Sequence, residues 1–234
     1  AFAANDIPLA GMFMCSILAN EGLPNIPPDF MKGAATLVRN AGGLFIADEV
    51  QAGFCRTGRW WGYETSDFVP DIVTMGKPMG NGMPLAGVAA STELVETFRK
   101  NTGYFNTFAS SPLQAAVGSA VLDVIEEEDL CANVAEVGDY LRTALRALQR
   151  NHEPMGDVRG HGLAIGIDWV LERESKTPDR EGAAEVANRL KDKGFLISNM
   201  GPLGNLLKIR PPLVFGREHA DLFLNAFEET LREL

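Results

Sequence analysis

Two acids and a lysine stand at the ends of short apolar runs, where their side chains could carry out chemistry. Asp48 and Glu49 directly follow the run LFIA, and Lys77 follows IVTMG and precedes a loop rich in Gly and Pro. Such runs predict buried strands, and ligands of open α/β sheets bind beyond the carboxyl ends of the strands. A lysine in a low-dielectric pocket at this edge would have a neutral amine that can form an imine.

Each of these features is common by itself, since most charged side chains that follow a strand are solvated. A carboxylate and a lysine at two strand ends are, however, the pair that pyridoxal-phosphate (PLP) chemistry requires. The lysine forms a Schiff base with the cofactor and later carries a proton, while the acid keeps the pyridine nitrogen protonated. This combination therefore makes PLP a candidate cofactor and Lys77 a candidate for the residue that would hold it.

The first half of the chain has the α/β pattern that could position these side chains. Buried strands are predicted at residues 11–18, 42–50 and 71–77, with a fourth from Leu85 and a following helix capped by Ser91 or Thr92. The stretch between the first two strands has the pattern of a helix that begins after a proline pair. Apolar runs separated by helices are typical of a mostly parallel sheet.

From Ser111 onward, long helical signals replace this pattern, and the longest of them covers residues 133–150. The tail combines predicted strands and helices in the following order: VRGHGLAIGIDWV as a strand pair, a helix at 180–193, the strands FLISN and LLKIRPPL, and a closing helix at 218–234. We therefore predict a division into residues 1–129 and a smaller α+β domain at 130–234.

The composition is that of a globular protein with a hydrophobic core. The chain has 234 residues, of which 46% are hydrophobic, and no apolar run reaches membrane-spanning length. Its formal net charge of -10 disfavours binding to nucleic acid or to anionic membranes. Three cysteines without CxxC spacing argue against disulfides and structural zinc, and they predict a cytoplasmic location. The three histidines are not clustered, so no metal site is predicted.

Several motifs resemble those of the class III aminotransferase family, in the same order and at the same spacing. They are FIADEVQAGFCRTG, DIVTMGKPMGNGMPLAG, YFNTFASSPLQAAVGSAVLDVIEEEDL, VRGHGLAIGIDW and LKIRPPLVF, which together span nearly the whole chain. The resemblance implies a PLP fold-type I homodimer. Residues 1–129 would be part of the PLP-binding large domain, incomplete at its N-terminus, and residues 130–234 the small domain.

The resemblance also assigns roles to individual residues. Asp48 would pair with the pyridinium nitrogen, Val50 would pack on the ring face, and Gln51 would lie near the ring hydroxyl. Lys77 would form the Schiff base, and Thr107 of FNTF would reach the cofactor phosphate of the neighbouring subunit. Each active site would then be shared between two subunits. Two further residues are not assigned to the cofactor. We expect Arg56 to fix a loop rather than to touch the substrate. We assign no role to His161, because histidines in loops are often exposed.

The resemblance covers only part of the family pattern. Family members are nearly twice as long as this chain, and their first half supplies the loop that cradles the phosphate and an aromatic residue that stacks on the ring. We therefore expect the chain to belong to a longer protein and, by itself, to bind the cofactor weakly.

Two positions differ from the pattern of many relatives. Cys15 stands where these have a glutamate, and Lys208 stands where they have an arginine that grips the substrate carboxylate. A lysine is a point charge that could hold a carboxylate or a phosphate. Lys208 is therefore a candidate substrate-binding residue, and Arg210 is a second one if its side chain turns inward. We expect pyruvate or glyoxylate, rather than 2-oxoglutarate, to be the preferred acceptor.

Three functions fit these observations. The first is an aminotransferase that moves an amino group from an amine or amino acid to a 2-oxo acid. The second is a phospho-lyase that acts on an amino-alcohol phosphate, a reaction also found among relatives and favoured by Lys208. The third is an inactive fragment that keeps the fold without turnover. Release of phosphate from phosphoethanolamine would separate the second function from the first.

Overall fold

The computed structural model describes residues 7–109 and 111–234, which form two compact units. Among the described residues, the first unit contains 7–16, 26–54, 60–109 and 111–128, and the second contains 17–25, 55–59 and 129–234. The division at residues 129/130 stays a prediction for the whole protein. Two short segments, 17–25 and 55–59, belong to the second unit although the sequence pattern places them among the elements of the first.

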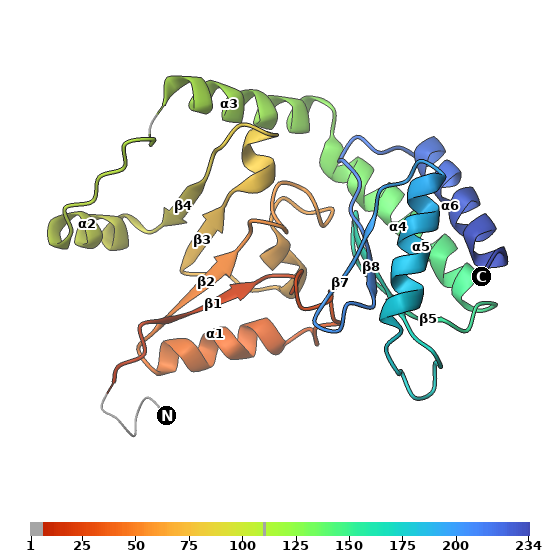
Figure 1. The fold of residues 1–234 in the computed structure, drawn as a ribbon. Coiled ribbons are helices and arrows are strands. Elements are labelled where there is room, and N and C mark those ends of the chain that lie inside the picture. Colours follow the sequence, from red (N-terminus) through yellow and green to blue (C-terminus); the bar gives the residue numbers. More distant parts are fainter. Residues whose placement is uncertain (1–6, 110) are drawn as a thin grey trace. The chain divides into compact units, whose positions relative to one another are not determined.

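The first unit is built on a four-stranded sheet in the order β1-β2-β3-β4 (Figure 1). Strands β1 (Gly11–Cys15), β2 (Leu44–Asp48) and β3 (Ile72–Met75) run parallel, and β4 (Gly87–Ala90) pairs antiparallel with β3. The predicted mostly parallel sheet is therefore present. Its last strand runs antiparallel because the short 3₁₀ helix η3 (Lys77–Gly80) and the loop after it reverse the chain between β3 and β4.

Helix α1 (Phe30–Asn40) covers one face of this sheet (Figure 1). Its residues Met31, Ala35 and Val38 recur at helical spacing and pack in one cluster with Phe45 of β2 and with Phe68. On the other face of the sheet, Phe13 of β1 is exposed. The helix α2 (Thr92–Asn101) begins where the sequence predicts, because the Ser91 hydroxyl accepts a 3.3 Å hydrogen bond from the Leu94 amide. Two further helical elements complete the unit: η2 (Gly62–Ser66) and α3 (Pro112–Glu127).

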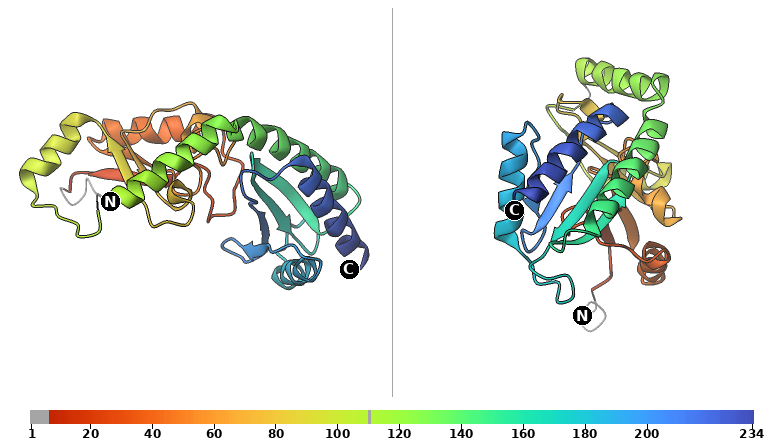
Figure 2. Two further views of the ribbon diagram at one scale, coloured as in Figure 1. Left: turned by 90° about the horizontal axis from the view of Figure 1, so that it is seen from above. Right: turned by 90° about the vertical axis from the view of Figure 1, so that its right-hand side faces the viewer.

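The second unit contains an antiparallel sheet in the order β5-β6-β8-β7. Its strands are β5 (Met155–His161), β6 (Ala164–Trp169), β7 (Ser198–Met200) and β8 (Leu206–Ile209). Three helices accompany it: α4 (Leu130–Gln149), α5 (Arg180–Asp192) and α6 (Arg217–Arg232). Figure 2 shows this sheet with α4 and α6 beside it.

Alternate residues of these strands form one hydrophobic core with all three helices. Val158, Ile165, Ile167, Leu207 and Ile209 belong to this core, as do residues of α4, α5 and α6. The helices therefore cover the face to which these side chains point, and the intervening residues of the strands point to the opposite face. The predicted strand FLISN is displaced, since the paired residues are Ser198–Met200, which hydrogen-bond to β8.

Helix α4 lies directly against the turn between β5 and β6. A Cβ atom at Gly138 of α4 would come within 2.3 Å of the Gly162 carbonyl oxygen, so this contact requires glycine in the helix. Gly162 itself has a φ of 50°, which a side chain would disfavour. The glycines of the VRGHG motif thus serve turn geometry, while His161 between them is exposed.

Candidate active site

The carboxyl ends of the three parallel strands form a row of side chains. Cys15 pairs in register with Asp48, and Asp48 pairs in register with Thr74. Lys77 follows Thr74 by three residues, at the same edge of the sheet. Parallel pairing therefore brings the predicted acid and the predicted lysine to the ends of neighbouring strands, where ligands of such sheets bind.

Asp48 is half-buried, and its carboxylate accepts a 3.0 Å hydrogen bond from the Val50 amide. This bond from two residues further along the chain fixes the orientation of the carboxylate at the strand end. Glu49, the other acid of the pair, has a fully buried side chain. The two adjacent acids are thus in different environments, and only Asp48 lies in the row formed by the strand ends.

Lys77 is the first residue of η3 and has a φ of 43°. A non-glycine residue in this left-handed region costs about 1–2 kcal/mol, and such residues cluster at functional sites. The side chain of Lys77 is exposed. A low-dielectric pocket around this lysine stays a prediction for the whole protein, since the residues of this chain by themselves leave Lys77 exposed.

The remaining predicted cofactor residues are Val50, Gln51 and Thr107. A Cβ atom on Gly76 would be 3.7 Å from Cγ2 of Val50, so the Val50 methyl group adjoins the residue before Lys77. Gln51 is half-buried in the turn that follows Val50. Thr107 lies in an exposed turn in which the Asn106 side chain accepts a 3.0 Å hydrogen bond from the Phe108 amide. No described contact joins Thr107 to Asp48 or Lys77.

Glu49 holds the chain around the end of β2. Its carboxylate accepts hydrogen bonds from the Ser16 hydroxyl, from the Gly62 amide at 2.6 Å and from the Tyr63 amide at 2.9 Å. Burial raises the pKa of Glu49 above its ordinary value, although these three hydrogen bonds act in the opposite direction. Glu49 therefore connects β1, β2 and η2 and is not available to a ligand.

The two predicted substrate residues lie in the second unit, on or just after β8. Lys208 is 3% exposed, and its ammonium group donates a 2.7 Å hydrogen bond to the Ala19 carbonyl. Arg210 is exposed. Arg56 serves the structural role that the sequence predicts, since its guanidinium donates to the carbonyls of Leu163 and Pro211. Burial and the charge of Arg210 lower the pKa of Arg56 to about 10.

The side chains at the edge of the parallel sheet have the chemistry that PLP requires. Lys77 offers an accessible amine for the cofactor aldehyde, Asp48 offers a carboxylate for the ring nitrogen, and Val50 offers an apolar surface beside Gly76 for the ring. These residues could therefore hold the cofactor. In the described part of the chain, no three His, Cys, Asp or Glu side chains lie close enough to hold a metal ion. None of the helices that the structure describes is long and apolar enough to cross a membrane.

Comparison with known proteins decides which family carries this arrangement. The model of the family described as Aminotransferase class-III matches residues 2–231. The chain belongs to the class III aminotransferase family. Family membership confirms the resemblance drawn from the sequence motifs, and members of this family are PLP-dependent.

Three relatives illustrate the range of the family. The chain is 41% identical to "Alanine--glyoxylate aminotransferase 2 homolog 2, mitochondrial" of Arabidopsis thaliana, covering 97% of this chain and 47% of the plant protein. It is 44% identical to "Ethanolamine-phosphate phospho-lyase homolog 1" of Caenorhabditis elegans, covering 94% of this chain and 48% of that protein. A solved phospholyase from Arthrobacter in complex with phosphoethanolamine is 42% identical, with a TM-score of 0.96 over 99% of this chain and 55% of that one.

The structural neighbours among class III enzymes confirm the predicted PLP fold-type I architecture, and the parallel-rich sheet is consistent with a partial large domain. The chain spans about half the length of the relatives it matches. The predicted cytoplasmic location stays a prediction, and the name of the Arabidopsis relative places that protein in mitochondria.

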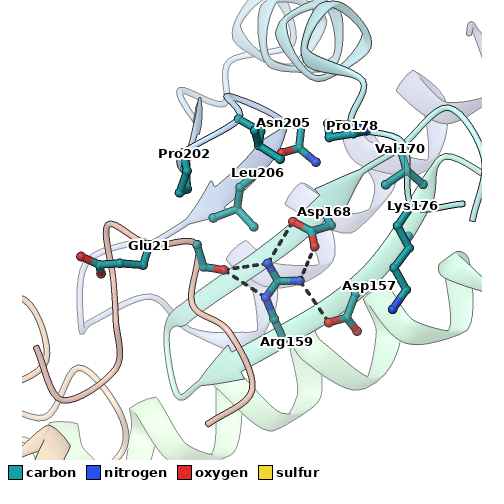
Figure 3. Close-up of a pocket in the computed structure, with 14 residues that line it drawn as sticks. Glu21, Asp157, Arg159, Asp168, Val170, Lys176, Pro178, Pro202, Asn205 and Leu206 are labelled. Carbon is teal, nitrogen blue, oxygen red and sulfur yellow. Dashed lines mark hydrogen bonds and ion pairs between the residues drawn. The ribbon is translucent and has the colours of Figure 1, made fainter.

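Two residues with prominent structural roles were not singled out by the sequence. Ser16 binds Glu49, and Arg159 binds the carbonyl of Gly22 together with Asp157 and Asp168 (Figure 3). Arg159 could have been noticed as a basic residue within a predicted strand. Its neighbour Val158 belongs to the core, so alternation places Arg159 on the opposite face of the sheet. No comparable signal exists for Ser16.

Replacing Glu49 with Gln tests the role of this buried carboxylate. At neutral pH we expect Glu49→Gln to lower the free energy of unfolding by about 1–3 kcal/mol, because an amide NH₂ would face a backbone N–H. A raised pKa in the folded state means that wild-type stability falls as pH rises from the ordinary carboxyl value of 4.5 through the raised pKa. The stability difference between wild type and variant should therefore shrink as pH rises, as measured by urea unfolding.

The matched control is Glu64→Gln, since Glu64 is exposed and accepts one hydrogen bond, from the Trp61 amide. It should change stability by less than about 1 kcal/mol. A difference between wild type and Glu49→Gln that grows with pH would contradict a raised pKa for Glu49.

Proposed function

We propose that the protein containing this chain is a PLP-dependent enzyme that acts on primary amines and holds its cofactor through Lys77. The observation that carries the proposal is the register of the parallel strands. Asp48 pairs with Thr74, and Lys77 follows Thr74 at the same sheet edge with an exposed amine and a left-handed backbone. Membership of the class III aminotransferase family supports the same assignment.

The side chains of this edge have distinct roles in the proposed reaction. When bound, PLP supplies an electron sink for the carbon that bears the substrate amine. Lys77 would hold the cofactor through Nζ and, when the substrate amine takes its place, Nζ would carry the proton of that carbon. Asp48 would pair with the ring nitrogen and keep it protonated. Gln51 would lie near the ring hydroxyl, and Val50 would pack against the ring.

Chemical labelling tests the assignment of Lys77. We expect incubation of the whole protein with PLP, followed by borohydride reduction, to leave a pyridoxyl group on the peptide that contains Lys77. Mass spectrometry of the digested protein locates the label. Lys77→Ala should lose it, whereas Lys100→Ala, which removes an exposed lysine of α2, should keep it. Absence of label at Lys77 in the whole wild-type protein would overturn the proposal.

For the complete reaction we propose transfer of the amino group to a 2-oxo acid, with pyruvate or glyoxylate preferred over 2-oxoglutarate. The relatives named as alanine–glyoxylate aminotransferases support this choice. A second candidate is elimination of phosphate from an amino-alcohol phosphate. The likeness to the Arthrobacter phospholyase and to the C. elegans relative favours this second reaction. Both reactions would begin when a primary amine takes the place of Lys77 on the cofactor. In the first the amino group would then pass to the 2-oxo acid, and in the second phosphate would leave the substrate.

The products separate the two reactions. An aminotransferase is expected to form glycine from glyoxylate when alanine is present, without release of phosphate. A phospho-lyase is expected to release inorganic phosphate from phosphoethanolamine without any 2-oxo acid. Both assays use the whole protein with PLP, and Lys77→Ala is the control that should abolish either activity. Clear preference for 2-oxoglutarate as acceptor would contradict the proposed acceptor, and activity in neither assay would contradict both reactions.

We further propose a homodimer in which Thr107 reaches the cofactor phosphate of the neighbouring subunit. The support is the apolar surface around Thr107, where Phe105 is 82% exposed and Phe108 is 85% exposed. Large exposed aromatic side chains at one place are typical of a protein–protein contact. Both lie within two residues of Thr107.

Replacing these aromatic side chains tests the dimer. In sedimentation experiments the whole protein should have the mass of a dimer, and the double variant Phe105→Ser/Phe108→Ser should shift toward a monomer with loss of activity. The control is Leu37→Ser/Val69→Ser, which removes exposed apolar side chains elsewhere in the same unit and should leave the dimer intact. A monomeric wild-type protein with full activity would overturn the shared site.

A further inference from the structure

The side chain of Glu49 is fully buried, and in the sequence it directly follows the candidate cofactor carboxylate of Asp48. Phe45 and Ala47 of β2 are also fully buried, and Phe45 packs against α1. Glu49 continues this series on the face that α1 covers, whereas Asp48 points to the opposite face. A buried carboxylate is costly unless its oxygens are hydrogen-bonded, so the partners of Glu49 define its role.

Three donors from two other segments bind the Glu49 carboxylate. The Ser16 hydroxyl, directly after β1, donates to Oε1, and Ser16 is 2% exposed. At the start of η2, the Gly62 amide donates to Oε2 at 2.6 Å and the Tyr63 amide to Oε1 at 2.9 Å. All four residues belong to the first unit. The carboxylate therefore joins the end of β1 to η2 across the end of β2.

The backbone of Glu49 is hydrogen-bonded on both sides. Its amide donates to the Thr74 carbonyl of β3 at 2.9 Å, and its carbonyl accepts a 2.9 Å bond from the Gly53 amide. The second bond closes a turn that includes Val50. Within this turn, the Val50 amide donates to the Asp48 carboxylate at 3.0 Å. The orientation of the Asp48 carboxylate therefore depends on where the backbone of Glu49 lies.

The start of η2 lies in close contact with the same turn. A Cβ atom on Gly62 would come within 2.4 Å of the Cβ atom of Ala52, so this approach requires glycine. A Cβ atom on Gly53 would be 3.1 Å from the Trp61 ring, which also packs against Phe54 with 5.4 Å between the ring centroids. The turn is thus confined by packing on this side as well as by its hydrogen bonds.

We propose that Ser16 and Glu49 are positioning residues that fix the Asp48 carboxylate for the ring nitrogen of the cofactor. They act through two direct links, the peptide bond between Asp48 and Glu49 and the hydrogen bond from the Val50 amide to the Asp48 carboxylate. A carboxylate held in one orientation binds its partner more tightly than one that must be ordered on binding. The effect on the cofactor rests on the proposed function, whereas the bonds of Ser16 and Glu49 exist within the first unit alone.

Hydrogen exchange in the whole protein without cofactor tests these bonds. In Ser16→Ala, which removes one donor to Glu49, the Val50 amide should exchange roughly tenfold faster, because the turn opens more readily. Ser16→Cys keeps a weak donor of similar size and should give an intermediate rate. Equal exchange in wild type and Ser16→Ala would overturn the proposal.

The matched control is Ser91→Ala, which removes a buried-sheet neighbour of the same residue type in the same unit. The Ser91 hydroxyl caps α2, and Ser91 follows Ala90, which pairs with the first residue of β3 at the end of the sheet away from Asp48. Loss of this cap should weaken α2 and leave exchange of the Val50 amide unchanged.

Cofactor binding tests whether Ser16 and Glu49 act on the ring nitrogen. The comparison uses PLP and its deaza analogue, which keeps the aldehyde and the phosphate but has a carbon in place of that nitrogen. Fluorescence titration of the whole wild-type protein should give tighter binding of PLP, because only PLP can pair with Asp48. Ser16→Ala should reduce this preference roughly fivefold, and Ser91→Ala should keep it.

The outcomes separate this proposal from the proposed function. A loss of affinity of equal size for PLP and the analogue in Ser16→Ala would reflect a general loss of stability and would overturn the positioning role. An unchanged preference in a protein that binds PLP would likewise refute the positioning role alone. Failure of the wild-type protein to bind PLP would refute the proposed function and, with it, the role of Ser16 and Glu49 toward the ring nitrogen.

Discussion

Parallel pairing of β1, β2 and β3 is the constraint on which the candidate site depends. Its register sets Cys15, Asp48 and Thr74 in one row, and Lys77 follows at the same edge. Parallel strands end at a common edge, so side chains that are distant in the sequence meet there. The row would be lost if the register slipped by one residue, because every side chain would then turn to the opposite face.

The adjacent acids Asp48 and Glu49 at the end of β2 lie in different environments. Asp48 stays half-buried at the strand end, while Glu49 turns into the protein and binds a hydroxyl and two backbone amides. Alternation along the strand forces this separation, since neighbouring side chains point to opposite sides. Asp48 therefore stays at the sheet edge, and Glu49 connects β1, β2 and η2.

Buried charges have a comparable function in the antiparallel sheet. Arg159 and Lys208 lie on the face opposite to the helix-covered core and bind carbonyl groups of one irregular segment, residues 17–25. Burying a charge is costly unless it is paired and hydrogen-bonded, and the two carboxylates beside Arg159 meet that requirement. Irregular backbone also needs partners for its polar groups, so the cations and the segment satisfy each other.

The type of most elements was predictable from the sequence, because it depends on local spacing of apolar residues. The buried strands and the long helix α4 follow from such spacing, and the start of α2 follows from the capping residue Ser91. The limits of short strands were less predictable: β1 ends at Cys15, and β7 begins only at Ser198, where pairing with β8 begins. Strand limits depend on a partner strand, which the local pattern does not contain.

The sequence by itself determined which reactive side chains are present at the strand ends, namely a lysine and an acid, and the family pattern around them. Only the tertiary structure decided that Glu49 is buried, that Lys77 is exposed, and that Lys208 binds a backbone carbonyl. The physical reason is sequence separation. Lys208 meets Ala19 across 189 residues and Arg159 meets Gly22 across 137, and the environment of a charge is set by such distant neighbours.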